Sequence, residues 1–198
     1  MAVFNYLSDH WVELIGFVFG IVYVVLIIRE HAWGWVAGSI NVMIYIVVFY
    51  QSGLYGMSLL QVFYLLVSIY GFLLWRGHLP SKNQNRIEKI RNMPVNIGWL
   101  LTLSVFAASL LAGYMLSITD SPVPRIDGLT TVLGLAATWM TARKYIENWL
   151  VWIINDLICV VIYAYLGLYL TTALYFVFLV MAVVGYVAWR KKMELQKG

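Results

Sequence analysis

Seven long apolar runs follow one another along the chain, and short polar segments separate them. Most of these runs approach the ~20 residues that an α-helix needs to cross ~30 Å of hydrocarbon. The fifth run is short and gives the weakest signal of the set. The runs cover residues 11–28, 33–50, 56–75, 95–116, 127–142, 146–165 and 169–189. This pattern predicts an all-α membrane protein with seven transmembrane helices.

The first part of the chain recurs 114 residues later. When residues 29–76 are aligned with residues 143–190, 14 of the 48 positions are identical. Unrelated segments of this composition would match at roughly a tenth of positions. The matches other than Leu, Ile and Val pair Arg29 with Arg143, Trp35 with Trp149, Asn41 with Asn155, Gly53 with Gly167, Tyr55 with Tyr169, Gly71 with Gly185, Trp75 with Trp189 and Arg76 with Arg190. Such a repeat within a membrane chain is typical of transporters whose substrate lies between two halves.

Two copies of three helices can have the same orientation only if one additional helix reverses the chain between them. The run at 95–116 has no counterpart in the repeat and supplies that helix. We therefore expect a 3+1+3 architecture of parallel repeats, related by an axis along the membrane normal. The expected domains are a first three-helix repeat at 1–76, a cytoplasmic linker with the linking helix at 77–126, and a second repeat with a cytoplasmic tail at 127–198.

Composition and charge support a membrane protein and give its orientation. The chain is 63% hydrophobic and 11% charged, whereas soluble domains carry about a quarter charged residues. Of the 13 Lys and Arg residues, all but Arg125 fall in the segments after the first, third, fifth and seventh runs. The positive-inside rule then places the N-terminus outside and the C-terminus in the cytoplasm. The net charge of +4 is thus an orientation signal, and no nucleic-acid partner is expected.

Several chemistries have no support in the sequence. The single cysteine, Cys159, excludes an intrachain disulfide and offers no metal site on its own. No Walker motif for ATP binding is present. There is also no HExxH, no GxSxG and no paired Cys/His metal pattern. We therefore expect no catalytic residue, no metal and no cofactor.

The polar side chains that fall at membrane depth are the candidates for a binding site. Asp156 lies in the middle of the sixth run, where an ionisable group is costly and functional by default. Trp149 and Trp152 lie seven and four residues before it, on the same helix face. Indoles provide flat faces for a ring or a cation, and a carboxylate provides an acceptor or a counter-charge. Two alternatives stay open: a buried and neutralised Asp156, and tryptophans of the membrane-interface belt.

The repeat distinguishes shared positions from positions that only one half carries. In the first half, Gly38 stands in place of Trp152 and Val42 in place of Asp156. The stripe of indoles and carboxylate is therefore confined to the second half. Residues that match across the repeat are expected to be architectural, whereas those that differ are expected to contact the substrate.

Further candidates lie on the second, third and sixth runs. Gln61, Tyr64 and Ser68 share one face of the third run, and that face is less polar in the second half. Gln61 is the best ligand among them, with an interhelical amide hydrogen bond as the alternative. Asn41 and Asn155 match across the repeat, which favours an interhelical role for both beside their candidacy as substrate contacts.

The polar groups also limit the ligand. No Lys or Arg falls at the middle of a run, so a phosphorylated substrate would meet no counter-charge there. The sequence therefore predicts a small, flat ligand without a phosphate group, and the indoles and carboxylate are compatible with a cation.

Four segments of the chain resemble a known family, the Pnu transporters of bacterial inner membranes. The stripe matches the family's W-x-x-W-x-x-x-D/N spacing, and the family's plan fits nearly the whole chain, about 11–190. The segments that carry the resemblance are RKYIENWLVWIIND at 143–156, GLY at 53–55, LQVFY at 60–64 and SIYG at 68–71.

The resemblance implies a function and a set of site residues. It implies uptake of nicotinamide riboside, an NAD precursor, by facilitated diffusion with alternating access, followed by trapping through a cytoplasmic kinase. It also implies a fold like that of the sugar-exporting SWEET proteins, and a homotrimer. By the family's pattern, the substrate contacts are Trp149, Trp152 and Asp156, together with Gln61.

Three alternatives remain open. Relatives in the same family carry thiamine or riboflavin, and thiamine shares with nicotinamide riboside a flat ring with a permanent positive charge. A membrane-embedded enzyme is an alternative from a different class, and it would need a second acid, base or metal ligand near Asp156. A structural or receptor-like membrane protein is the third alternative.

Overall fold

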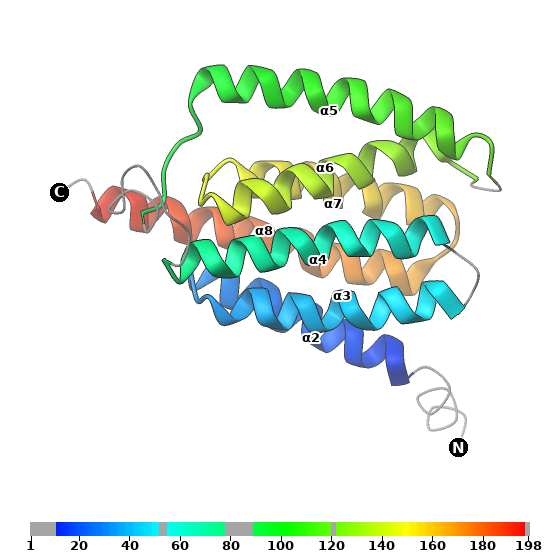
Figure 1. Ribbon diagram of the computed structural model, residues 1–198, viewed down its shortest axis with the longest axis horizontal. Helices are drawn as coiled ribbons and strands as arrows, with labels where there is room; N and C mark the ends of the chain where they lie inside the picture. Colours follow the sequence, from blue (N-terminus) through cyan, green and yellow to red (C-terminus); the bar gives the residue numbers. More distant parts are fainter. Residues whose placement is uncertain (1–10, 52–54, 78–88, 120–121, 197–198) are drawn as a thin grey trace. The chain divides into compact units, whose positions relative to one another are not determined.

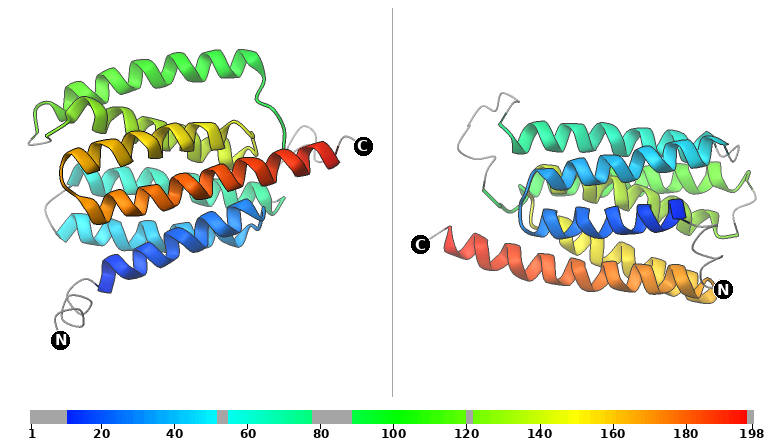
Figure 2. Two further views of the ribbon diagram at one scale, coloured as in Figure 1. Left: turned by 180° about the vertical axis from the view of Figure 1, so that it is seen from behind. Right: turned by 90° about the horizontal axis from the view of Figure 1, so that it is seen from below.

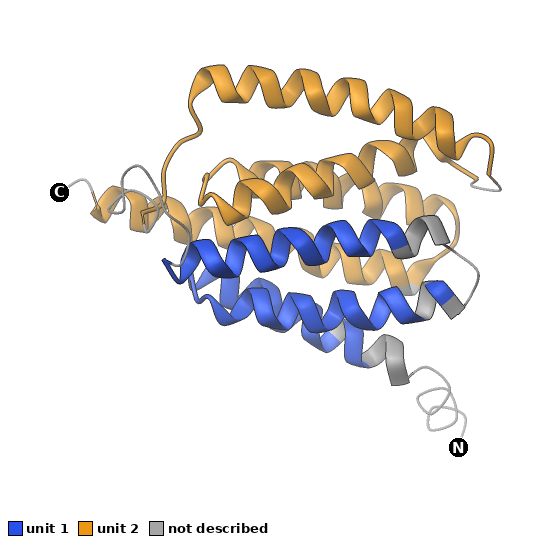
Figure 3. Ribbon diagram, viewed as in Figure 1, with its two compact units in different colours: residues 1–82 blue, residues 83–198 orange. Residues whose placement is uncertain are grey.

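The computed structural model describes residues 11–51, 55–77, 89–119 and 122–196. Within these residues the secondary structure consists of seven α-helices (Figure 1). By its internal contacts the chain divides into two compact units, residues 1–82 and residues 83–198 (Figure 3).

The first unit is built around a central helix. Its helices are α2 (Trp11–Ile28), α3 (Trp33–Gln51) and α4 (Tyr55–Trp75). Helix α3 packs against both α2 and α4. The Trp35 side chain at the start of α3 is fully buried, so the core of this unit lies where the three helices meet near that residue.

The second unit has the same succession of neighbours with one helix added. Its helices are α5 (Val95–Leu116), α6 (Pro124–Ala142), α7 (Asn148–Tyr165) and α8 (Tyr169–Leu195). The central α7 packs against α6 and α8, and α5 runs alongside α6 in both views of Figure 2. Much of α5 is exposed and apolar, including Leu103, Phe106 and Leu110, as expected for a helix surrounded by hydrocarbon.

The seven predicted runs are confirmed as helices, and their ends differ by a few residues. Helix α6 begins at Pro124 rather than at residue 127, because proline suits the first turn of a helix, where no N–H partner is needed. Helix α8 continues to Leu195, six residues beyond the predicted end. Its last turns carry Lys and Arg, which favour helix and extend their charged ends into water.

The helices differ in how well each meets the criteria for crossing a membrane. In the described part of the chain, α5, α7 and residues Thr171–Leu195 of α8 are long and apolar enough to cross one. Helix α6 is less apolar because it contains four threonines. The hydroxyls of Thr138 and Thr141 donate to carbonyl oxygens one turn back, at 2.7 and 2.8 Å, which satisfies these polar groups within their own helix.

The turn that precedes the central helix has the same backbone geometry in both units. Glu30 and Lys144, which are 114 residues apart, have φ angles of 55° and 54°. Residues other than glycine rarely adopt this left-handed conformation. The hydrogen bonds also correspond, since Glu30 N–H donates to Ile27 at 2.9 Å and Lys144 N–H donates to Thr141 at 3.0 Å. The sequence repeat therefore coincides with a repeated turn.

A tight tryptophan contact anchors the first unit. The Trp35 indole lies against Gly71 of α4, and a Cβ added to this glycine would lie 2.5 Å from the ring. Trp75 meets Trp35 edge-on, with 5.6 Å between ring centroids and an angle of 89° between the planes. Edge-to-face pairs of this kind add about 0.5–1.5 kcal/mol to the burial of the rings. Position 71 is therefore a glycine because α3 and α4 approach closely there.

Candidate functional site

Four of the predicted site residues lie on α7 of the second unit. Trp149, Asn155 and Asp156 are buried, with 2%, 5% and 4% of their surface exposed, and Trp152 is half-buried. Spacings of three and four residues place Trp149, Trp152 and Asp156 on one face of the helix. The stripe that the sequence predicts is therefore present as a helix face.

Trp149 occupies the same kind of position as its counterpart Trp35. A Cβ added to Gly185 of α8 would lie 2.6 Å from the Trp149 ring. Trp189 meets this ring edge-on at 5.4 Å, with 90° between the planes. This contact repeats that of Trp35 with Gly71 and Trp75 in the first unit, so the geometry favours a packing role for Trp149.

Trp152 has no equivalent in the first unit. Its counterpart is Gly38, and a Cβ added there would lie 2.9 Å from the Tyr23 ring of α2. A tryptophan would not fit at that position without moving Tyr23. In the second unit the counterpart of Tyr23 is Ala137, which is fully buried. The first unit thus has a large residue, Tyr23, on α2 and a glycine on α3. The second unit has a small residue, Ala137, on α6 and a tryptophan on α7, so Trp152 is a feature of the second unit alone.

Asn155 and Asp156 form a polar pair beside Trp152. The two residues are adjacent on α7, and both side chains are buried. The Asn155 Oδ1 atom has no hydrogen-bond partner among the described residues. An unsatisfied buried acceptor costs about 1–3 kcal/mol. The pair therefore presents acceptors that a ligand with hydroxyl or amide donors would satisfy.

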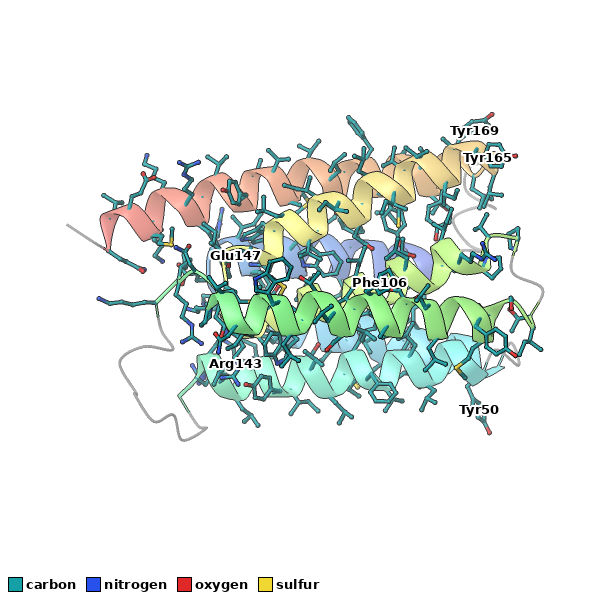
Figure 4. The ribbon with its side chains drawn as sticks, turned by 90° about the horizontal axis from the view of Figure 1, so that it is seen from above. Tyr50, Phe106, Arg143, Glu147, Tyr165 and Tyr169 are labelled. Atoms are coloured by element: carbon teal, nitrogen blue, oxygen red, sulfur yellow. The ribbon has the colours of Figure 1, made fainter. Side chains whose placement is uncertain are left out.

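The same face of α7 continues beyond the predicted residues. Cys159 and Tyr163 follow Asp156 at spacings of three and seven residues, and Cys159 is buried. Tyr163 stacks on Tyr175 of α8, with ring centroids 5.2 Å apart and planes inclined by 27°. In Figure 4 the two ends of this helix can be followed from the labels of Glu147 and Tyr165.

The remaining predicted site residues lie in the first unit. The Asn41 amide donates to the backbone oxygen of Gly16 at 3.0 Å and so links α3 to α2. This bond agrees with the interhelical role that the repeat favoured for Asn41. On α4, Gln61 and Tyr64 are half-buried and Ser68 is buried, and their spacing places all three on one face, as predicted.

Sequence reasoning missed the contacts at the start of α7. The Glu147 carboxylate accepts the Met93 N–H. In the sequence, Glu147 stands out only as an acidic residue close to Arg143 and Lys144. This does not identify Met93 as its hydrogen-bond partner. Across the described residues, no group of three or more His, Cys, Asp or Glu side chains could hold a metal ion.

A solved structure has the same fold. The crystal structure of the vitamin B3 transporter PnuC matches with a TM-score of 0.74 and 25% sequence identity, over 98% of this chain and 86% of that chain. The fold and the apolar helices thus define a multi-pass membrane transport protein.

Sequence comparison identifies the family. The family model described as nicotinamide mononucleotide transporter matches residues 10–191, so the chain belongs to this family. The nicotinamide riboside transporter PnuC of Escherichia coli is 29% identical over 90% of this chain and 84% of that relative. The PnuC of Neisseria mucosa is 27% identical over 100% and 78%. These matches confirm the resemblance to the Pnu transporters and support an inner-membrane location.

Proposed function

We propose that the protein takes up nicotinamide riboside by facilitated diffusion. Both relatives described above are nicotinamide riboside transporters, and the matched structure is of a vitamin B3 transporter. The main support for the proposal is a pair of side chains on α7. In a chain of this family, α7 has an indole and a carboxylate, Trp152 and Asp156, where the first half has glycine and valine. A flat cationic ring attached to a ribose suits that combination.

Each site residue then has a distinct role. Trp152 stacks on the nicotinamide ring, and Asp156 with Asn155 accepts hydrogen bonds from the ribose hydroxyls. Gln61 and Tyr64 of α4 are further candidate substrate contacts. Trp149 and Asn41 support these contacts, because one packs against Gly185 and the other holds α3 to α2.

The absence of a phosphate group on the substrate follows from charge. The α7 face carries a carboxylate, and no Lys or Arg lies in the sequence between Asn148 and Tyr165. A nucleotide monophosphate would bring its negative charge next to Asp156 in a region that desolvates both groups. The riboside avoids this cost, and phosphorylation by a cytoplasmic kinase would prevent its return and trap it in the cell.

The proposed architecture is a SWEET-like 3+1+3 arrangement that operates by alternating access and assembles as a homotrimer. Its proposed domains are residues 1–76, 77–126 and 127–198. The repeated turn at Glu30 and Lys144 and the repeated tryptophan contacts support two equivalent halves. The distribution of Lys and Arg supports an N-terminus outside and a C-terminus in the cytoplasm.

A binding panel on purified protein tests the proposal. Nicotinamide riboside, nicotinamide mononucleotide, thiamine and riboflavin are titrated while tryptophan fluorescence is recorded, and uptake into liposomes is measured for each compound that binds. We expect saturable binding and uptake of nicotinamide riboside and no binding of the mononucleotide. Thiamine is the second candidate, because its charged ring suits the same indole and carboxylate. Preference for thiamine or riboflavin would overturn the assignment while leaving the class of vitamin transporter intact.

A further inference from the structure

The segment that leads into α5 is bound to the turn between α6 and α7. The Arg91 N–H donates to the Lys144 carbonyl oxygen at 3.1 Å, and the Ile146 N–H donates to the Arg91 carbonyl oxygen at 3.0 Å. These two hydrogen bonds form a parallel bridge between Arg91 and Tyr145. We call residues 90–93 together with residues 143–147 the interlock.

Charged side chains reinforce the interlock. Both oxygens of the Glu147 carboxylate accept the Met93 N–H, at 3.1 and 3.0 Å. The Arg91 guanidinium lies 4.8 Å from the centroid of the Tyr145 ring, and its Nη2 donates to the Tyr145 hydroxyl at 3.4 Å. Hydrogen bonds to a charged group are roughly twice as strong as neutral ones, so the segment is held by more than its backbone.

The interlock continues directly into the first turn of α7. Asn148 is fully buried, and its amide donates to the Tyr145 carbonyl oxygen at 2.6 Å. Its Oδ1 lies 3.1 Å from the Thr141 hydroxyl, which shares its proton with the Ala137 carbonyl oxygen. The Trp149 N–H then donates to the Ile146 carbonyl oxygen at 3.2 Å. A continuous series of hydrogen bonds therefore joins residues 90–93 to the helix that bears Trp152 and Asp156.

The first half of the repeat has different side chains at these positions. Tyr145, Ile146, Glu147 and Asn148 correspond to His31, Ala32, Trp33 and Gly34. The turn nevertheless has the same backbone conformation in both halves. The turn can therefore form without Glu147, and the groups that bind residues 90–93 are an addition specific to the half that carries the candidate site.

Helix α5 is also held to α6 near its other end. A Cβ added to Gly128 would lie 2.5 Å from the backbone nitrogen of Gly113, so the two helices touch backbone to backbone. Small residues allow such close packing between membrane helices. The interlock precedes the first turn of α5, and this contact lies at its last turn. Helix α5 is therefore attached to the rest of the second unit at both ends.

We propose that the interlock positions the substrate-binding face of α7 and stays closed throughout the transport cycle, so that α5 moves together with α6, α7 and α8. Glu147 and Arg91 are positioning residues, which act on Trp152 and Asp156 through the first turn of α7. The inference rests on the proposed function, because the affinity is measured with nicotinamide riboside.

The first experiment compares two substitutions of one residue. Glu147→Ala removes the acceptor of the Met93 N–H, and the Kd for nicotinamide riboside should rise roughly tenfold, the size of a lost charge-assisted hydrogen bond. Glu147→Gln keeps an acceptor oxygen and should restore the Kd to within about twofold. Glu194→Ala is the matched control, because Glu194 pairs with Arg190 at an exposed position, at 3.4 Å. A purely structural role would lower the melting temperature in Glu147→Ala and leave the Kd unchanged.

The second experiment closes the interlock covalently. Residues paired across a bridge have Cα atoms at a separation suited to a disulfide, so Arg91→Cys and Tyr145→Cys are combined in a Cys159→Ala background. We expect efficient cross-linking, equal uptake in the oxidised and reduced forms of this variant, and recovery of the Kd when the cross-link is added to Glu147→Ala. Single-cysteine variants under the same oxidant control for other effects of oxidation.

Each result bears on a definite part of the inference. Loss of uptake on oxidation, with uptake retained on reduction, would show that the interlock must open during transport. Failure to cross-link would show that the contact is not populated, and failure to recover the Kd would remove its positioning role. If the unmodified protein does not bind nicotinamide riboside, the proposed function fails, whereas the cross-linking yield and the melting temperature still test the closed interlock.

Discussion

At the scale of single residues, the two tryptophans of the stripe have different surroundings. Trp149 is buried against Gly185 and repeats the environment of Trp35. Trp152 is half-buried and stands where the first half has a glycine that Tyr23 covers. Packing of the second unit thus accounts for Trp149, whereas the exposed part of Trp152 remains available to a ligand.

Trp152→Ala should therefore weaken substrate binding more than it weakens the fold. Loss of an aromatic stack or of a desolvated cation–π contact costs about 1–3 kcal/mol, so we expect the Kd for nicotinamide riboside to rise by roughly fivefold or more. Trp35→Ala is the control, and it should reduce the yield of folded protein more than the affinity. Titration of both variants gives the answer, and an unchanged Kd in Trp152→Ala would remove this residue from the site.

Asp156→Asn tests whether the carboxylate pairs with a charge or accepts hydrogen bonds. Asparagine keeps the shape and one acceptor oxygen but removes the charge. Because asparagine keeps an acceptor oxygen and the proposed partners are ribose hydroxyls, we expect affinity within about twofold of the unmodified protein. The measurement is the Kd from pH 5 to pH 8 for both proteins. A large loss of affinity with intact folding, together with a flatter pH dependence, would assign Asp156 to the positive charge of the ring instead.

At the level of residues, the sequence was informative mainly where the two halves of the repeat could be compared. Membrane depth singled out Asp156, and comparison of the halves distinguished Trp152 and Asp156 from their counterparts Gly38 and Val42. The comparison also favoured the interhelical role of Asn41, whose amide bonds to Gly16. It could not identify the partner of Glu147, because residues 90–93 lie outside the repeat and have no counterpart. A contact between segments 54 residues apart in sequence leaves no periodic signal in either of them.

At the scale of elements, the position of each helix was predictable and the contacts between helices were not. Long apolar runs located all seven helices, but Gly71 and Gly185 were only identities in an alignment until the packed indoles explained them. Each glycine lets its helix approach the central helix of its unit.

Gly185→Ala should therefore destabilise the second unit. Its new Cβ would lie 2.6 Å from Trp149, and overpacking of this kind costs about 1–3 kcal/mol. We expect a lower melting temperature in detergent, and Gly71→Ala should show a similar loss because its Cβ would lie 2.5 Å from Trp35. Gly98→Ala is the matched control, since its nearest neighbour would be 3.6 Å away and alanine favours helix. Equal melting temperatures for all three variants would contradict the close contacts.

These glycines also separate packing from substrate contact. If Trp149 touches the substrate directly, Gly185→Ala should shift the indole and weaken binding, whereas Gly71→Ala should not. If Trp149 only packs, the two variants should bind nicotinamide riboside equally well once folded. Comparison of their Kd values assigns the role of Trp149 without removing its side chain.

At the scale of the whole molecule, the two halves combine a shared scaffold with unequal chemistry. The left-handed residue before the central helix and the indole packed on glycine occur in both. Among the described residues, the polar stripe and the interlock occur only in the second. The repeated turn and the indole–glycine packing are thus common to both halves, whereas the candidate recognition residues Trp152 and Asp156 are not.

Orientation is the remaining property of the whole molecule that the sequence predicts, and both ends of α8 can test it. This helix has 27 residues and is therefore about 40 Å long, enough to cross a bilayer. Leu168 precedes it and is 48% exposed, and Lys191 lies in its exposed basic end.

In a Cys159→Ala background, Leu168→Cys should react with an impermeant thiol reagent in intact spheroplasts, because the positive-inside rule places this end outside. Lys191→Cys should react only after the membrane is permeabilised, and the cysteine-free background controls for non-specific labelling. Reaction at position 191 but not at 168 in intact spheroplasts would reverse the orientation and place the start of α7, with the interlock, on the outer side of the membrane.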